Sequence, residues 1–226
     1  MVSACALPAV VPAVPPAVAP PATGAALPAL DLDAPGRGAD QLAAWARDRA
    51  AVLDVPASAL EAYGWAAASV ARSAPGCGIG WTTLAGIGSV ETGHGRFGGS
   101  RLDRDNRAQP PIRGAALDGR PGVAEIRDTD GGALDGDTTF DRAMGPMQFI
   151  PGTWEQWGVD ADGDGVADPD DLDDAALAAA RYLCASGGDL TAAGGWNRAV
   201  LTYNRSSSYV REVLERSASY AAGRSA

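Results

Sequence analysis

Residues 81–95 of this 226-residue chain read WTTLAGIGSVETGHG, an apolar helical run that stops among glycines. Glycine just past the last periodic residue is a common helix stop, so we predict that the helix ends at 93–95. Glu91 then lies at the negative end of the helix dipole, which disfavours a carboxylate. Apolar neighbours such as Ile87 and Val90 add desolvation, and both effects raise the pKa of the carboxyl. Such a carboxyl can protonate a leaving oxygen, so Glu91 is a candidate acid catalyst.

His94, the only histidine of the chain, lies three residues after Glu91. We interpret it as a capping or loop residue, because a histidine between glycines just past a helix has no helical face to present. A catalytic partnership with Glu91 is the alternative.

Composition excludes one class of partner. The formal net charge is −10, which argues against nucleic acid, since nucleic-acid-binding proteins need basic surfaces. Eight of the aspartates lie in one stretch, 160–174, so much of the acid is a local feature. No apolar run is long enough to predict a transmembrane helix.

The N-terminal residues 1–36 differ in composition from the rest and are dominated by alanine, valine and proline. Proline fixes φ and removes backbone donors, so we predict an extended, disordered linker or lipoprotein tail. The letters VSAC at 2–5 look like the end of a bacterial lipobox, with Cys5 as the lipidated residue. The alternative is an alanine-rich tail with an isolated cysteine.

Helical periodicity predicts one mainly α domain over 37–222. Asp40 is a predicted N-cap, and Ser/Thr-x-x-Glu/Gln patterns at 58–61 and 153–156 predict capping boxes. Strand signals are few, with one short candidate at 123–126. The Gly-, Asp- and Arg-rich segment before Arg142 predicts solvated turns, and the sequence assigns no role to its residues 103–137.

The acidic stretch DADGDGVADPDDLDD fits the first part of an EF-hand loop. The positions that supply oxygens and the sharp turn fall, in order, on Asp160, Asp162, Asp164, Gly165 and the carbonyl of Val166. Position 12 falls on Asp171, one methylene shorter than the usual glutamate. The stretch therefore predicts a calcium site at 160–174.

Three blocks together resemble lytic murein transglycosylases of the B type, in particular their actinobacterial branch. The segment AGIGSVETGHGRFGG resembles the catalytic block, in which a glutamate is followed by a small hydroxyl residue and then x-His-Gly. The segment AMGPMQFIPGTWEQWGVDADGDGVADPDDLDDAALAAARYLC resembles the next block, a Gly-x-x-Gln-Phe turn, a Pro-started helix and a calcium loop. The segment LTYNRSSSY resembles the last block, a Tyr-Asn pair with a second tyrosine.

The resemblance implies a lysozyme-like helical fold and cleavage of the β-1,4 bond between N-acetylmuramic acid (MurNAc) and N-acetylglucosamine (GlcNAc). One carboxyl, Glu91, would act as acid and then as base, giving a 1,6-anhydro-MurNAc end without water. It also implies that the calcium loop closes on Asp174 rather than on Asp171, and that the calcium is structural. The substrate-binding residues that it implies are Thr139, Met147, Gln148, Phe149, Tyr203, Asn204 and Tyr209.

The resemblance sets the remaining expectations. We expect a monomeric enzyme of the cell envelope or a secreted one, acting on peptidoglycan glycan strands without an organic cofactor. In such an exported protein Cys77 and Cys184 would form a disulfide, with two buried free thiols as the alternative. A muramidase-type hydrolase, with Asp137 or Asp141 as second carboxylate, and a non-catalytic wall-binding protein remain the alternative functions.

Overall fold

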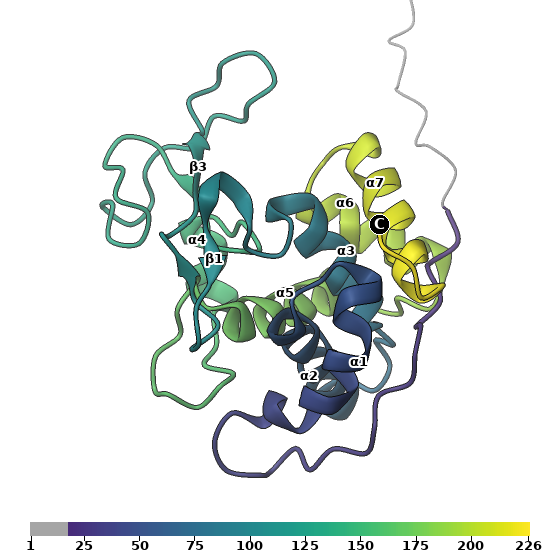
Figure 1. Ribbon diagram of the computed structural model, residues 1–226. Helices are drawn as coiled ribbons and strands as arrows, with labels where there is room; N and C mark the ends of the chain where they lie inside the picture. Colours follow the sequence, from purple (N-terminus) through teal and green to yellow (C-terminus); the bar gives the residue numbers. More distant parts are fainter. Residues whose placement is uncertain (1–17) are drawn as a thin grey trace, which may run out of the picture.

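A computed structural model describes residues 18–226, and most of their regular structure is helical (Figure 1). The prediction of a mainly α fold is confirmed. The proposed lipidation of Cys5 lies outside the described residues. The elements are η1 Gly38–Leu42, α1 Ala43–Leu53, α2 Ala57–Ser73, α3 Trp81–Thr92, η2 Phe97–Gly99, β1 Arg101–Leu102, β2 Ala108–Gln109, β3 Arg113–Ala116, β4 Arg142–Met144, α4 Pro151–Trp157, α5 Leu172–Gly187, α6 Ala193–Tyr203 and α7 Ser207–Ala221.

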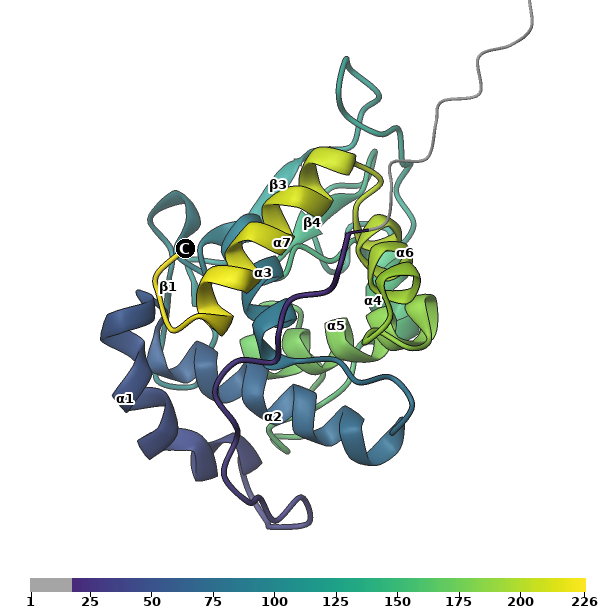
Figure 2. The same cartoon turned by 90° about the vertical axis from the view of Figure 1, so that its right-hand side faces the viewer.

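Helix α5 runs through the middle of the molecule, and α2 and α6 pack against it (Figure 1). Alanine lets neighbouring helices approach closely, and five alanines of α5 are fully buried. Figure 2 shows α7 lying across α3, and these two helices share the most extensive helix–helix contact. Among the helices of residues 18–226, none has both the length and the apolar character that crossing a membrane requires.

The strands are short and lie together on one side of the helices (Figure 1). Strand β1 pairs antiparallel with β2, and β3 pairs antiparallel with β4. The strand expected at 123–126 does not form; Glu125 makes only an isolated bridge with Asp118. The expected turn chemistry of this region is confirmed, because aspartate side chains accept its backbone N–H groups. Asp128, for example, accepts from Asp130 and Gly131.

The described part of the Ala/Pro-rich segment, residues 18–37, is extended as expected but packed against the domain rather than free of it. Its carbonyl oxygens accept hydrogen bonds from buried side chains of the helices. Trp45 Nε1 donates to Ala26 O and Trp81 Nε1 to Ala25 O, both at 3.0 Å. Proline-rich backbone leaves its carbonyls unpaired, so the indole N–H groups find acceptors there.

The predicted N-terminal helix caps are wrong. Asp40 lies inside η1, while α2 and α4 begin at Ala57 and Pro151 without a side-chain cap. Glu61 instead accepts a hydrogen bond of 2.7 Å from Arg37, which also pairs with Asp173 at 2.8 Å. A buried carboxylate is stabilised by a charged partner more than by a helix end that water can satisfy.

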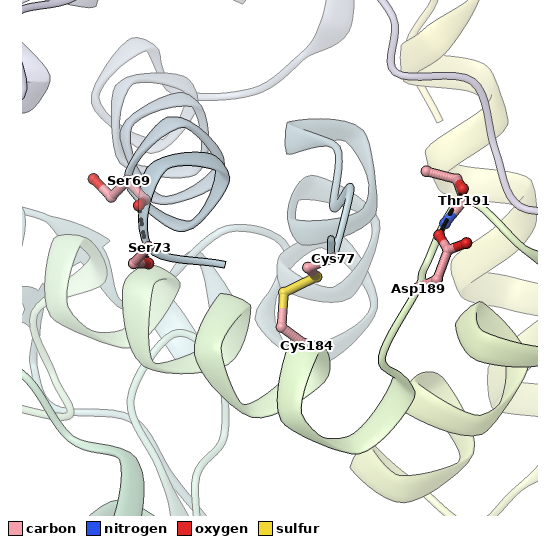
Figure 3. The surroundings of a disulfide bond; sticks show 6 residues. All are labelled: Ser69, Ser73, Cys77, Cys184, Asp189 and Thr191. Carbon is pink, nitrogen blue, oxygen red and sulfur yellow. Dashed lines mark hydrogen bonds between the residues drawn. A yellow bond between two sulfur atoms is a disulfide. The ribbon is translucent and has the colours of Figure 1, made fainter. Parts of the chain in front are cut away.

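A disulfide joins Cys77, in the turn after α2, to Cys184 on α5, as Figure 3 shows. The Cα atoms are 5.4 Å apart, within the ordinary range for a disulfide. The prediction of this bond is confirmed. The bond connects positions 107 residues apart and holds the end of α2 to the central helix.

Candidate active site

Glu91 lies in the last turn of α3, and the backbone turns away immediately after it. Gly93 has a left-handed φ of 59° and donates to Ser89 O at 3.0 Å. His94, also left-handed at φ 62°, donates its backbone N–H to Gly88 O at 2.8 Å. These bonds cap the helix as the sequence predicted and leave the Glu91 carboxyl half-buried at its end.

The environment of Glu91 favours the neutral acid. Burial raises the pKa of Glu91 to about 7, and a hydrogen bond from Tyr209 lowers it by a smaller amount. The Tyr209 hydroxyl donates to Glu91 Oε1 at 2.5 Å. Tyr209 stands in the first turn of α7, which Ser206 caps by accepting the Tyr209 backbone N–H. The carboxyl is thus poised to give and take a proton near neutral pH.

A hollow of about 430 Å³ adjoins the end of α3, and Glu91 is among the residues that line it. Phe97, whose side chain is 60% exposed, and Arg96 line the same hollow. The two glycines that follow Phe97 face open space. A bulky ligand therefore has room to approach Glu91 from this side.

A tight turn carries Gln148, the amide that the sequence singled out. Its first residue, Gly145, has φ 67°, and a Cβ there would lie 1.8 Å from Pro169 O, so only glycine fits. Gln148 itself is left-handed at φ 53°, and its Nε2 donates to Gly145 O at 2.9 Å. Tyr203 at the end of α6 fixes the turn by donating to Met147 O at 2.7 Å.

The residues on either side of Gln148 are core residues in this structure. Met147 is 0% and Phe149 is 3% exposed, and the Phe149 ring packs edge-on against Tyr203 and Trp154. A sugar face cannot reach side chains that are this deeply buried, so these two residues are not placed to bind substrate directly as the resemblance implied. Their contacts support the Gln148 turn on the side that faces the core.

Two other expected substrate residues are exposed. Asn204 follows α6, and its backbone N–H caps that helix, so its side-chain amide is free to meet a ligand. Thr139 is held in its turn by a backbone hydrogen bond to Asp137 Oδ1. Among the described residues, no hydrogen bond joins the Thr139 hydroxyl to Glu91, whose carboxyl is bonded by Tyr209 instead.

The acidic loop brings three of its predicted calcium ligands together. Asp160, Asp162 and Asp164 each offer an oxygen, and these oxygens lie within 4.8 Å of one another. Their carboxylates accept backbone N–H groups of the loop itself, which orders the loop and leaves further lone pairs for an ion. Calcium takes six to eight oxygen ligands, and these three carboxylates would supply part of such a shell.

Asp174, the residue expected to close the loop, is bonded to the loop backbone. It accepts N–H groups from Ala161 and Asp168, and burial, with a smaller contribution from the charges of Asp162 and Asp160, raises its pKa to about 7. Asp171 instead caps α5 by accepting from Asp173.

One residue at this loop, Arg107, was not predicted from the sequence. Its guanidinium bonds Asp164 and lies 3.6 Å from both Asp168 and Asp171. Arg107 belongs to the loop between β1 and β2, 57 residues before Asp164, and no local pattern links the two.

A comparison with known protein families matches one segment of the chain. Residues 137–200 match the transglycosylase SLT domain. The match confirms the predicted enzyme class, a lytic transglycosylase that degrades peptidoglycan. It covers less than a third of the chain, including the Gln148 turn and the acidic loop but neither Glu91 nor Asn204. A comparison with curated proteins found no match.

Three solved structures are similar in part. Escherichia coli lytic transglycosylase Slt35 in complex with bulgecin A is 18% identical, covering 80% of this chain and 79% of that one, with a TM-score of 0.44. The calcium complex of Slt35 gives the same identity and coverage and a TM-score of 0.47. SltB3 from Pseudomonas aeruginosa, in complex with NAG-anhNAM-pentapeptide, is 21% identical over 74% of this chain and 66% of that one, with a TM-score of 0.43.

Proposed function

We propose that the protein is a B-type lytic transglycosylase that cleaves the MurNAc-β-1,4-GlcNAc bond of peptidoglycan with Glu91 as its single acid–base group. The observation that carries this proposal is the half-buried Glu91 carboxyl, whose pKa is raised to about 7 beside the Tyr209 hydroxyl. A group that titrates near the working pH can serve both as acid and as base.

During the reaction Glu91 donates one proton and later accepts one. Glu91 gives its proton to the glycosidic oxygen, which leaves as the 4-hydroxyl of GlcNAc. The C6 hydroxyl oxygen of the same MurNAc then bonds to C1, and its proton passes to Glu91. The carboxyl is restored, the MurNAc end is a 1,6-anhydro sugar, and no water is consumed.

Neither sequence candidate for a second carboxylate, Asp137 or Asp141, is free to act with Glu91, and Asp54, which lines the same hollow as Glu91, pairs with Arg96 at 3.1 Å. Glycosidases that add water use a second carboxylate as nucleophile or base. Asp141 is fully buried and accepts from the Thr129 N–H and hydroxyl. Asp137 pairs with Arg142 at 2.8 Å, and its pKa is lowered by backbone hydrogen bonds. Both aspartates are already bonded within their own loop, which favours a transglycosylase over a hydrolase.

The other site residues bind or support in this proposal. Gln148 and Asn204 present amides to sugar hydroxyls and N-acetyl groups, and Tyr209 directs the acid. Tyr203, through Met147 and Phe149, supports the Gln148 turn. Thr139 lies on an exposed loop from which it could reach a bound glycan.

Calcium is the metal that the acidic loop would hold. Asp160, Asp162, Asp164, the Val166 carbonyl and Asp174 would be its ligands, and none of them belongs to the acid site. The ion would neutralise the loop and fix α4 relative to α5, so its role is structural. We place the enzyme outside the cytoplasm, where its disulfide would persist.

The testing experiment compares Glu91→Gln with the parent on purified peptidoglycan. Loss of positioned acid catalysis reduces the rate by about 10²–10⁴-fold, while an unchanged melting curve shows that the fold is intact. Glu155→Gln, which removes an exposed carboxylate of α4, is the matched control and keeps full activity. A Glu91→Gln rate within tenfold of the parent would contradict the proposal.

A further inference from the structure

A buried chain of three polar side chains lies beside the site and has no part in the proposed reaction. His94 is 1% exposed, and its Nδ1 lies 3.1 Å from the Tyr63 hydroxyl while its Nε2 lies 2.9 Å from the Tyr220 hydroxyl. Burial lowers the pKa of His94 to about 3, so the ring is neutral at working pH. A neutral imidazole has one donor and one acceptor, and a hydroxyl can satisfy either, so both nitrogens are used.

The ring connects three helices. Tyr63 belongs to α2 and Tyr220 to the last turn of α7, while His94 follows α3 directly. The backbone of His94 is itself fixed by its bond to Gly88 O. The ring therefore holds the far end of α7 to the part of the chain that also carries Glu91.

Helix α7 packs across α3 in the most extensive helix–helix contact of the described residues (Figure 2). A Cβ on Gly86 would lie 2.1 Å from Ser217 Oγ and 2.9 Å from Val213 O, so the helices touch where side chains are smallest. Tyr209 and Tyr220 stand on either side of this point. They are eleven residues, or about three turns, apart and so share one face of α7.

Apolar packing gives little direction to how α7 lies on α3, because hydrogen bonds need a defined geometry and apolar contacts do not. Two hydrogen-bonded contacts supply that direction, Tyr209 with Glu91 on one side of Gly86 and Tyr220 with His94 on the other. Without the Tyr220 contact, we expect α7 to shift on α3 and the Tyr209 hydroxyl to move away from Glu91.

We propose that His94 is a positioning residue: through Tyr220 it fixes the angle at which α7 crosses α3 and so keeps the Tyr209 hydroxyl on Glu91. The inference rests on the proposed role of Glu91. His94 is too deeply buried to touch a glycan, so its contribution concerns the rate of the chemical step and not the binding of substrate.

The decisive variant is Tyr220→Phe, which keeps the ring and removes one hydroxyl. Because small misplacements of a catalytic group reduce rates by up to ~10²-fold, we expect kcat to fall about tenfold while KM stays within about twofold. Two substitutions of His94 separate its nitrogens. The Gln amide reaches as far as Nε2 and can keep Tyr220, whereas the shorter Asn amide matches Nδ1 and can keep only Tyr63. His94→Gln should therefore retain more kcat than His94→Asn.

Thr82→Val is the matched control. Thr82 is fully buried in the first turn of α3, where its hydroxyl donates to Ala22 O at 2.9 Å, away from α7. The variant loses one buried hydrogen bond of the same helix, so its melting temperature falls while kcat is unchanged.

Either of two results would overturn the inference. One is a Tyr220→Phe variant that loses stability like Thr82→Val but keeps kcat within twofold of the parent. The other is a folded His94→Asn variant that is as active as His94→Gln. An active Glu91→Gln enzyme would instead overturn the proposed function, so the two failures are distinguishable.

Discussion

The Tyr209 hydroxyl donates a hydrogen bond to Glu91 Oε1, joining residues 118 apart in the sequence. The two neighbours of the carboxyl act in opposite directions: apolar burial favours the protonated form and the Tyr209 bond favours the charged one. Burial has the larger effect, and the pKa rises to about 7. Burial also raises the pKa of Tyr209, so its hydroxyl stays protonated and remains a donor.

The first prediction concerns the pH dependence of kcat. Glu91 must be protonated to act as acid, so activity is retained below its pKa and lost as the pH rises through about 7. Initial rates on soluble glycan strands between pH 5 and 9 measure this loss of activity, which is the alkaline limb of the pH–rate profile. Activity that stays constant up to pH 9 would show that another group supplies the proton.

The second prediction is that Tyr209→Phe moves this limb to higher pH. The lost hydrogen bond stabilises the carboxylate, so its removal raises the pKa of Glu91 further. We expect kcat at pH 6 to fall about tenfold as well, because the carboxyl is no longer held in one orientation. A limb that moves to lower pH would contradict the assigned direction of the bond.

The third prediction concerns calcium. Chelation should lower the melting temperature, and calcium should restore it while magnesium should do so poorly, because magnesium demands a small octahedral shell. Asp160→Asn should weaken this response. Asp130→Asn alters the second acidic cluster, formed with Asp128 and Asp141, and is the matched control with an unchanged response. Equal melting temperatures with and without chelator would remove the calcium site.

The fourth prediction is a pH effect on the metal-free protein. Burial and neighbouring carboxylates raise the pKa of Asp171 to about 8, and burial with the charges of Asp162 and Asp160 raises that of Asp174 to about 7. Raised values mean that the neutral carboxyls stabilise the fold fully below ~pH 4, the unfolded pKa, and that this stability is lost as the pH rises through 7 to 8. Calorimetry should show a falling melting temperature from pH 6 to 9 without calcium and a flatter profile with it. A rising metal-free profile would contradict the assignment.

The fifth prediction concerns the disulfide. Replacing both Cys77 and Cys184 by serine should lower the free energy of unfolding by about 2–5 kcal/mol, since the bond closes a long loop. Denaturant unfolding measures the change, and kcat of the folded variant should match the parent because neither residue touches the acid site. Equal stability of variant and parent would show that the bond is dispensable.

The sequence predicted the features that depend on local chemistry. The end of α3 just after Glu91 was predicted from the Gly-His-Gly run at 93–95. The acidic loop was predicted from its regularly spaced aspartates. Both patterns depend on near neighbours in the chain, so they can be recognised without the fold.

Apart from the disulfide, the features that depend on distant residues were mostly missed or wrong. The backbone of Met147 is held by a hydrogen bond from Tyr203, 56 residues further on. The capping box expected at 58–61 failed because Glu61 pairs with Arg37, and the position of Arg107 beside the acidic loop depends on how β1 and β2 pack. No local pattern encodes these contacts.

The central claim is that one carboxyl, Glu91, cleaves the glycan without water. Mass spectrometry of peptidoglycan digested in ¹⁸O-labelled water tests it most directly. We expect new MurNAc ends that are lighter than hydrolysed ends by one water and carry no label, and we expect none from Glu91→Gln. New reducing ends that each contain one ¹⁸O atom would contradict the claim and identify a hydrolase.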